Sequence, residues 1–193
     1  MKQSLGPQTL LYPAPVLVVG TYDDAGRPNM MTAAWGGVCC SQPPCITVSL
    51  RKATYSYGNI VARGCYTVSI PSERYLREAD YIGSVSGRDV DKWHMTGLTP
   101  VRSELVDAPY VAEFPLVVEC KVIVTNDLGL HTQFVGQVLD VKADESVLGA
   151  DGQPDITRVM PTLFAPAEYR YFAVGRDLGP AFSIGKTIGR DDD

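Results

Sequence analysis

Short apolar segments separated by turn residues dominate the chain, and several of them alternate apolar with polar positions. Residues 45–50, 65–70 and 116–125 are rich in Val, Ile, Thr and Tyr, which is typical of half-buried strands. Glycine and proline, 18 and 14 residues, punctuate the chain at short intervals. Strand patterns outnumber helix patterns and do not alternate regularly with them. The pattern predicts a mainly β protein, a small antiparallel barrel with a few peripheral helices.

Turn and capping residues mark two hairpins and two helices. One hairpin turn falls at residues 23–28, where Asp and Gly favour a turn, and the other at residues 126–129, which end in a glycine. Helices are predicted over residues 55–63, which a glycine follows, and over residues 73–82, which Ser72 precedes as a cap. Each helix is expected to cover an edge or an end of the sheet.

Composition indicates one globular domain. The chain has 193 residues, of which 45% are hydrophobic and 20% charged, and it contains neither an internal repeat nor a low-complexity linker. We expect a single domain over residues 1–189 and an acidic, disordered tail over residues 190–193. The net charge of -5 and a pI near 5.0 provide no basic stripe for a phosphate backbone. Nucleic acid is therefore not an expected partner.

The first 15 residues lack a basic stretch followed by a long apolar one, and no run reaches about 18 apolar residues. These features predict a cytoplasmic protein without a membrane partner. The five cysteines are odd in number and lie mostly in apolar stretches. The cluster Cys39, Cys40 and Cys45 has no Cys-x-x-Cys pair and no nearby histidine. We therefore predict reduced core thiols, with neither a disulfide framework nor a metal site.

Several motifs for other chemistries fail on their spacing. The dinucleotide fingerprint Gly-x-Gly-x-x-Gly is absent. Residues 179–187 end in Gly-Lys-Thr but have five residues between their glycines, where a phosphate-binding loop has four. Residues 83–87 imitate a nucleophile elbow, yet their central residue is Val85, which has no nucleophilic oxygen. Neither His94 nor His131 lies in a pattern typical of a hydrolytic triad.

Residues 29–35 form a strand-like segment of small and soft side chains. Its backbone amides suit hydrogen bonding with the pyrimidine edge of a flavin ring, and its tryptophan suits closing one side of that ring. An ordinary barrel strand with Met and Trp in the core explains the segment equally well. Under the first interpretation, the candidate residues are Asn29, Met30, Met31, Thr32, Ala33 and Trp35.

Residues 49–56 place two adjacent cations and three Ser or Thr hydroxyls where a strand passes into a helix. A helix start has unpaired N–H groups and a partial positive charge, so it favours a phosphate. The alternative is a solvated charged loop in which Thr54 only caps the helix. The candidate phosphate ligands are Arg51, Lys52, Thr54 and Ser56.

A polar, flexible loop predicted at residues 84–93 adds two more cations, of which Lys92 is the candidate for contact with a flavin. A cation beside the ring N1 and C2 carbonyl would stabilise the anionic reduced ring. A surface lysine paired with a neighbouring aspartate is an equally compatible alternative. His131 and Phe164 are weaker candidates for contact with the ring, because a lone histidine is commonly a surface residue and a phenylalanine commonly fills a core.

The order of these motifs resembles the flavin reductase-like, FMN-binding split-barrel family and, within it, the flavoredoxins. The resemblance extends from about residue 10 to residue 189. It rests on Gly20-Thr21, Asp24, Gly26-Arg27-Pro28-Asn29, Met31-Thr32, Trp35, Gln42-Pro43-Pro44, Ser49-Leu50-Arg51-Lys52, Thr54-Tyr55, residues 86–92, residues 129–134, Asp151-Gly152-Gln153-Pro154 and residues 181–186.

The resemblance implies a split β-barrel homodimer that holds FMN near the subunit interface. It implies that residues 29–35 line the ring, that the cluster at residues 51–56 serves the phosphate, that Ser86 and Lys92 complete the site, and that His131 and Phe164 close it, from the partner subunit in some members. The expected function is electron transfer from a donor such as a hydrogenase-linked carrier to a sulfur-oxyanion or other acceptor pathway. Since the cofactor supplies the chemistry, no catalytic side chain is expected.

Two alternatives to the electron carrier stay open. One is an NAD(P)H-dependent flavin reductase, in which a nicotinamide donor replaces the redox partner protein. The other is a non-catalytic module that binds flavin or haem.

Overall fold

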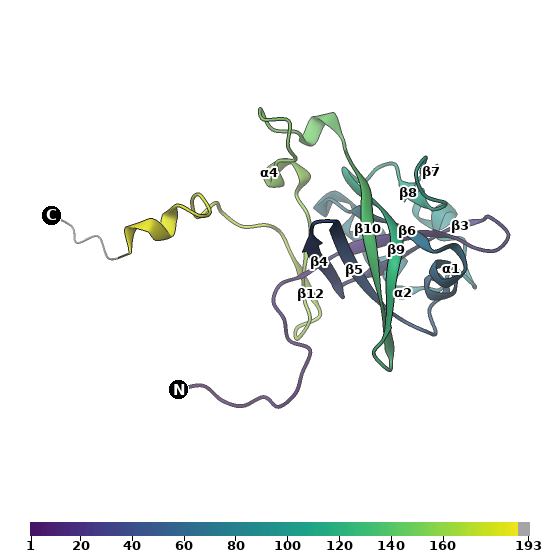
Figure 1. Cartoon of the computed structure of the whole chain (residues 1–193), viewed down its shortest axis with the longest axis horizontal. Helices are drawn as coiled ribbons and strands as arrows, with labels where there is room; N and C mark the ends of the chain where they lie inside the picture. Colours follow the sequence, from purple (N-terminus) through teal and green to yellow (C-terminus); the bar gives the residue numbers. More distant parts are fainter. Residues whose placement is uncertain (189–193) are drawn as a thin grey trace.

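The computed structural model describes residues 1–188, and its centre is a seven-stranded sheet with the order β3-β2-β6-β9-β10-β5-β4 (Figure 1). All neighbouring strands in it are antiparallel. The two edge strands, β3 (Pro28–Ala33) and β4 (Gly36–Ser41), are joined by only two residues. Because so short a connection keeps the edges close, the sheet must roll toward a barrel without closing. The Trp35 carbonyl in this connection accepts a hydrogen bond from the Ser49 amide at 2.8 Å.

Strand β2 (Leu17–Tyr22) and its neighbour β3 have apolar side chains on both faces. Val19 and Met31 belong to a cluster contributed by strands all around the rolled sheet, which is the interior of the barrel. Val18 and Met30 belong to a second cluster, formed with helices on the outer face. Since both faces are covered, these strands read in the sequence as nearly continuous apolar runs.

Local signals position the helices. Helix α1 (Tyr55–Arg63) begins after Thr54, whose side chain accepts a hydrogen bond from a backbone amide, and ends at Gly64 with a φ of 64°. The segment after Ser72 is a short 3-10 turn followed by α2 (Leu76–Ser84), as the sequence predicts with small shifts in its bounds.

The predicted loop at residues 84–93 is wrong at its end, because α3 (Lys92–Thr96) begins there. The Asp91 carboxylate caps this helix by accepting from the His94 amide at 3.1 Å. An Asp at the N-cap is a local signal for this start, but the helix is only five residues long and has no periodic pattern.

The structure confirms both predicted hairpins and the mainly β class, and it adds strands that the sequence pattern did not reveal. Gly129 has a φ of 88° in the second hairpin. The unpredicted strand β4 is exposed along most of its length and is rich in Gly and Cys, a composition that does not favour strands. The prediction of core thiols is wrong for Cys39 and Cys40, because they lie exposed on this edge strand. The other three cysteines are buried.

Outside the barrel, two small sheets and the chain termini complete the fold. The segment after β12 extends away from the barrel, as does the N-terminal segment (Figure 1). The predicted tail at residues 190–193 lies outside the described residues. Within residues 1–188 no helix is long and apolar enough to cross a membrane. The remaining elements are β1 (Ala14–Pro15), β5 (Pro44–Arg51), β6 (Cys65–Ile70), η1 (Glu73–Tyr75), β7 (Pro100–Arg102), β8 (Pro109–Val111), β9 (Leu116–Asp127), β10 (His131–Ala143), η2 (Glu145–Val147), α4 (Ile156–Val159), β11 (Leu163–Ala165), β12 (Arg170–Phe172) and η3 (Ile184–Thr187).

Candidate functional site

A cleft of about 460 Å³ opens where edge strand β3, the start of α1 and the segment after α2 meet. We call it the serine cleft, after the three serines in its wall. The strand near residue 30 and the cationic helix start near residue 52, which are predicted to adjoin, line this same cleft. Seven predicted site residues lie in its wall, namely Asn29, Met31, Arg51, Thr54, Ser56, Ser86 and Lys92.

The start of α1 presents a free cation and a helix N-terminus to the cleft. Arg51 is exposed, and among the described residues no ion pair or side-chain hydrogen bond occupies its guanidinium. The first turn of α1 contains no acidic residue that would neutralise its partial positive charge. An unpaired guanidinium beside unpaired helix amides is suited to binding an anion.

Lys92 lies beneath the cleft and is only 4% exposed. Its ammonium donates to the carbonyl of Met30 at 2.9 Å and to that of Ile82 at 2.7 Å, so it ties β3 to α2. Burial lowers the pKa of Lys92 to about 8. An ammonium has three N–H donors, which leaves one for a ligand. Lys92 is therefore not the surface lysine paired with aspartate that the sequence left as an alternative.

A buried polar network supports the wall of the cleft. The Asn29 amide donates to the Ser56 hydroxyl at 2.9 Å and to that of Thr21 at 3.3 Å, and all three residues are at least 95% buried. Gly87 passes so close that a Cβ at this position would lie 2.0 Å from the Asn29 Oδ1 and 3.1 Å from the Tyr55 ring. Only glycine allows the loop to approach the network at this point.

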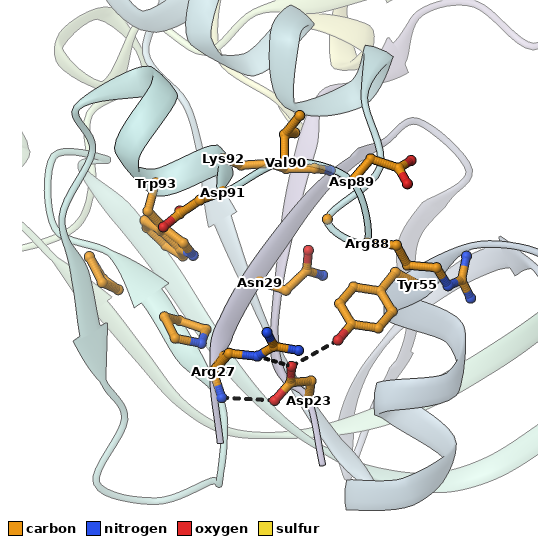
Figure 2. A pocket seen from close by; sticks show the side chains of 13 residues that line it. Asp23, Arg27, Asn29, Tyr55, Arg88, Asp89, Val90, Asp91, Lys92 and Trp93 are labelled. Atoms are coloured by element: carbon orange, nitrogen blue, oxygen red, sulfur yellow. Dashed lines mark hydrogen bonds and ion pairs between the residues drawn. The ribbon is translucent and has the colours of Figure 1, made fainter. Parts of the chain in front are cut away.

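A second hollow of about 450 Å³, the adjoining pocket, is drawn in Figure 2. It lies beside the serine cleft and shares six lining residues with it, among them Asn29, Tyr55 and Lys92. At its base the Asp23 carboxylate accepts from Arg27 Nε at 2.7 Å and from the Tyr55 hydroxyl at 2.8 Å. Burial disfavours the ionised Asp23, but these bonds and one from the Arg27 amide outweigh that effect and lower the pKa of Asp23 to about 2.

Two further side chains shape the adjoining pocket. The Arg88 guanidinium lies over the Tyr55 ring, 5.2 Å from its centroid. Figure 2 shows Trp93 across the pocket from Tyr55. Among residues 1–188, the Trp93 side-chain nitrogen is buried without a hydrogen-bond partner. Sequence reasoning did not select Tyr55, Gly87, Arg88 or Trp93, although all of them lie in or beside the motifs that carry the family resemblance.

Three residues predicted on strand β3 do not line the cleft. Met30 and Ala33 are buried in the two core clusters, so only their backbone is available to a ligand. The Thr32 hydroxyl donates to the carbonyl of Ala79 on α2. Side chains on a strand alternate between its faces, so Met30 and Thr32 lie on the face opposite Met31, whereas Ala33 shares the face of Met31 and packs in the barrel interior. A continuous prediction over residues 29–35 therefore includes core positions.

Four other predicted residues lie elsewhere within this single chain. Lys52 forms an exposed ion pair with Asp127, with Nζ 2.6 Å from Oδ2, and does not line the serine cleft. Trp35 lines one surface hollow together with Phe164 and another together with His131. The contribution of Trp35, His131 and Phe164 to the cleft stays a prediction, because it requires a second copy of the chain to bring these side chains to the cleft.

The sequence of the chain matches a known protein family over residues 9–173, which is more than half of its length. The chain belongs to the flavin reductase like domain family. The matched range includes every residue in the wall of the serine cleft, so the cleft is part of the family domain.

Solved structures support the same flavin reductase like assignment. The chain is 57% identical to the flavoredoxin of Desulfovibrio vulgaris (Miyazaki F), with a TM-score of 0.92 over 96% of this chain and 100% of that one. It is 30% identical to the flavoredoxin of Methanosarcina acetivorans, with a TM-score of 0.91 over 97% and 98%. A putative flavin reductase with a split barrel domain from Shewanella frigidimarina is 20% identical, with a TM-score of 0.80 over 89% and 87%, and shows the fold alone. The open, rolled sheet is a split barrel, as predicted.

Proposed function

We propose that this protein binds FMN in the serine cleft and carries electrons on it, as the flavoredoxin likeness suggests. The observation that carries the proposal is the unpaired Arg51 beside the α1 N-terminus, in the same cleft as the edge of β3. When bound, the flavin supplies the redox chemistry, and no side chain need act as an acid or a base. The proposed site belongs to a single domain over residues 1–189.

The residues of the cleft fit the two halves of FMN. Arg51, the free amides at the start of α1 and the Ser86 hydroxyl provide donors for a phosphate dianion. The Thr54 hydroxyl donates to the Arg51 carbonyl at 2.9 Å and caps α1, so it holds this helix start in place. Strand β3 is the outermost strand of the sheet, so its free backbone edge suits the hydrogen-bonding edge of the ring. The remaining N–H of Lys92 provides a cationic donor beneath the cleft.

The proposed assembly is a homodimer in which the partner subunit closes the site. Trp35, His131 and Phe164 line hollows on the surface of one chain and lie outside its serine cleft. A second copy would provide these side chains to the cleft of the first. The proposed acceptor is a redox partner protein in a sulfur-oxyanion or related pathway, and the proposed location is the cytoplasm.

The adjoining pocket favours a second candidate function, an NAD(P)H-dependent flavin reductase. It is continuous with the serine cleft through Asn29, Tyr55 and Lys92, and it has about 450 Å³ of its own volume. This volume, with Tyr55 and Trp93 on its sides, provides room for a second planar molecule. No Rossmann unit is required for such transient stacking.

Flavin content and reduction test both functions. We expect the purified protein to be yellow and to release about one FMN per chain on treatment with acid or heat. A colourless or haem-red protein that does not take up added FMN would contradict FMN binding. Rapid loss of absorbance at about 450 nm on addition of NADH or NADPH would favour the reductase, and indifference to both would favour the carrier.

The variant Arg51→Ala tests the phosphate site. Loss of a charge-assisted contact costs about 1.5 to 3 kcal/mol, so the Kd for FMN should rise about 10- to 150-fold. The control is Arg74→Ala, which removes an exposed arginine outside the serine cleft and should leave the Kd unchanged. Equal affinities of the two variants, measured by fluorescence titration of apoprotein, would remove Arg51 from the site.

A further inference from the structure

The hairpin formed by β4 and β5 brings three thiols together at the outer edge of the sheet. Cys40 on β4 and Cys45 on β5 are direct cross-strand partners next to the turn. The register shifts between Val38 and Cys40, which makes Cys39 the extra residue of a bulge. Cys39 and Cys40 are exposed, whereas Cys45 is 3% exposed.

The backbone geometry at this pair is compatible with a disulfide. Directly opposite residues in an antiparallel pair project to the same face, with Cα atoms about 4.5 to 5.5 Å apart. Disulfides span about 4.4 to 6.8 Å between Cα atoms. Both thiols also turn toward the loop, because Cys40 Sγ lies 3.4 Å from the Gln42 carbonyl and Cys45 Sγ lies 3.4 Å from the Pro43 carbonyl.

We propose that Cys40 and Cys45 form a reversible dithiol–disulfide pair that exchanges with low-molecular-weight disulfides. In the first step the Cys40 thiolate attacks a small disulfide RSSR, whose S–S bond breaks to release RS⁻, and this anion takes up the proton from Cys40. In the second step the Cys45 sulfur attacks Cys40 Sγ in the mixed disulfide and displaces the second RS⁻, which takes up the proton from Cys45. The protein loses two electrons and two protons, and RSSR becomes two RSH.

Exposure assigns different roles to the two thiols. Cys40 is accessible on the edge strand, so it is the thiol that an external disulfide reaches first. Burial raises the pKa of Cys45, and the nearby Cys40 and Cys39 thiols add to the increase. A buried thiol with a raised pKa reacts poorly with reagents in solution, but a neighbouring mixed disulfide is within its reach.

The proposed exchange is independent of the proposed flavin function. Cys45 and Arg51 stand near opposite ends of β5, six residues and therefore about 20 Å apart along the strand. Oxidation of the pair should leave FMN content unchanged, so the failure of one proposal does not imply the failure of the other.

The test uses the full chain, reduced and freed of reductant, and then incubated with excess oxidised glutathione. Free thiols are alkylated and the protein is analysed by intact mass and peptide mapping. Before alkylation we expect a mass lower by two hydrogens. After alkylation under denaturing conditions we expect the labelled thiols to fall from five to three, a peptide linked through Cys40 and Cys45, and full reversal by dithiothreitol.

Three single variants separate the pair from other outcomes. Cys45→Ser should retain glutathione at Cys40 as a stable mixed disulfide, and Cys40→Ser, at an exposed position with little risk to folding, should lose the internal link. The matched control Cys39→Ser should still form it. A Cys39–Cys40 link, a link between two chains, glutathione adducts alone on the wild-type protein, or five unreacted thiols would each overturn the proposal.

Discussion

The serine cleft and the adjoining pocket share a wall, but they differ in how their charges are satisfied. In the adjoining pocket Asp23, Arg27 and Tyr55 are bonded to one another, so much of their hydrogen-bonding capacity is used within the chain. In the serine cleft the Arg51 guanidinium has no partner among the described residues, and Lys92 retains one N–H. Charges paired within the chain hold the scaffold together, whereas the unpaired cations of the serine cleft are available to the proposed anionic ligand.

The largest expected effect comes from Gly87→Ala, which acts on the boundary between the two hollows. Its Cβ would lie 2.0 Å from Asn29 Oδ1, and Asn29 is held by Ser56 and Thr21, so it has little freedom to move. Overpacking of this kind costs about 3 kcal/mol, and we expect FMN affinity to fall about 100-fold. The control is Gly58→Ala, where a Cβ meets nothing within 4 Å. Equal Kd values in fluorescence titrations of the two variants would show that the boundary is not constrained.

Asp23→Asn should affect stability and leave binding largely intact. Removing the charge weakens the bonds from Arg27 and Tyr55 and should lower the free energy of unfolding by about 2 kcal/mol at pH 7. Because the pKa of Asp23 falls from 3.8 to about 2 on folding, its stabilisation is complete above pH 3.8 and is lost as the pH falls toward 2. Urea unfolding across this range should show a shallower pH dependence in the variant. A large loss of FMN affinity with unchanged stability would contradict the scaffold role.

Lys92→Met should change the pH dependence of binding. In the wild type, Lys92 loses its proton as the pH rises through about 8, so we expect FMN affinity to fall about tenfold above that pH. The affinity of the variant should be lower at pH 7 and should not vary with pH.

The stability of the wild-type apoprotein should rise with pH where its FMN affinity falls. The unfolded lysine, with a pKa of 10.5, binds more protons between pH 8 and 10.5, so wild-type stability rises across this window. Parallel binding curves for both proteins would exclude Lys92 from the site.

The smallest effect is expected from Lys52→Ala. The ion pair of Lys52 with Asp127 is exposed on both sides, with side chains 48% and 62% accessible, and pairs of this kind contribute little. We expect the equilibrium constant of unfolding and the Kd for FMN each to change by no more than about twofold. A loss of FMN affinity as large as that of Arg51→Ala would instead place Lys52 at the phosphate, as the sequence resemblance implies.

Elements with local signals could be predicted closely from the sequence. Helix α1 has the predicted bounds because Thr54 and Gly64 cap it, and the hairpin turn at Gly129 is defined by its own residues. Strand β4 could not be predicted, because it pairs through its backbone with β5 and has few side chains typical of strands. Partner pairing, and not residue preference, makes it a strand.

The candidate site divides in the same way. The strand near residue 30 and the cationic helix start near residue 52 could be selected from the sequence as candidate binding segments, because edge amides, cations and a helix cap are local chemistry. The sequence could not show which residues of these segments face the cleft. The side chains of β3 alternate between two cores, and this division depends on what covers each face of the sheet.

By itself the sequence determined the family, the strand-rich class and the capped helix, and it predicted a phosphate-binding cluster at residues 51–56, since these follow from residue types at short range. The tertiary structure alone decided that Lys92 is buried under β3 and α2, that Lys52 turns to Asp127, and that Cys40 faces Cys45. Each of these depends on segments far apart in the chain or on strand register, and the burial and pairing that result are properties of the packed molecule.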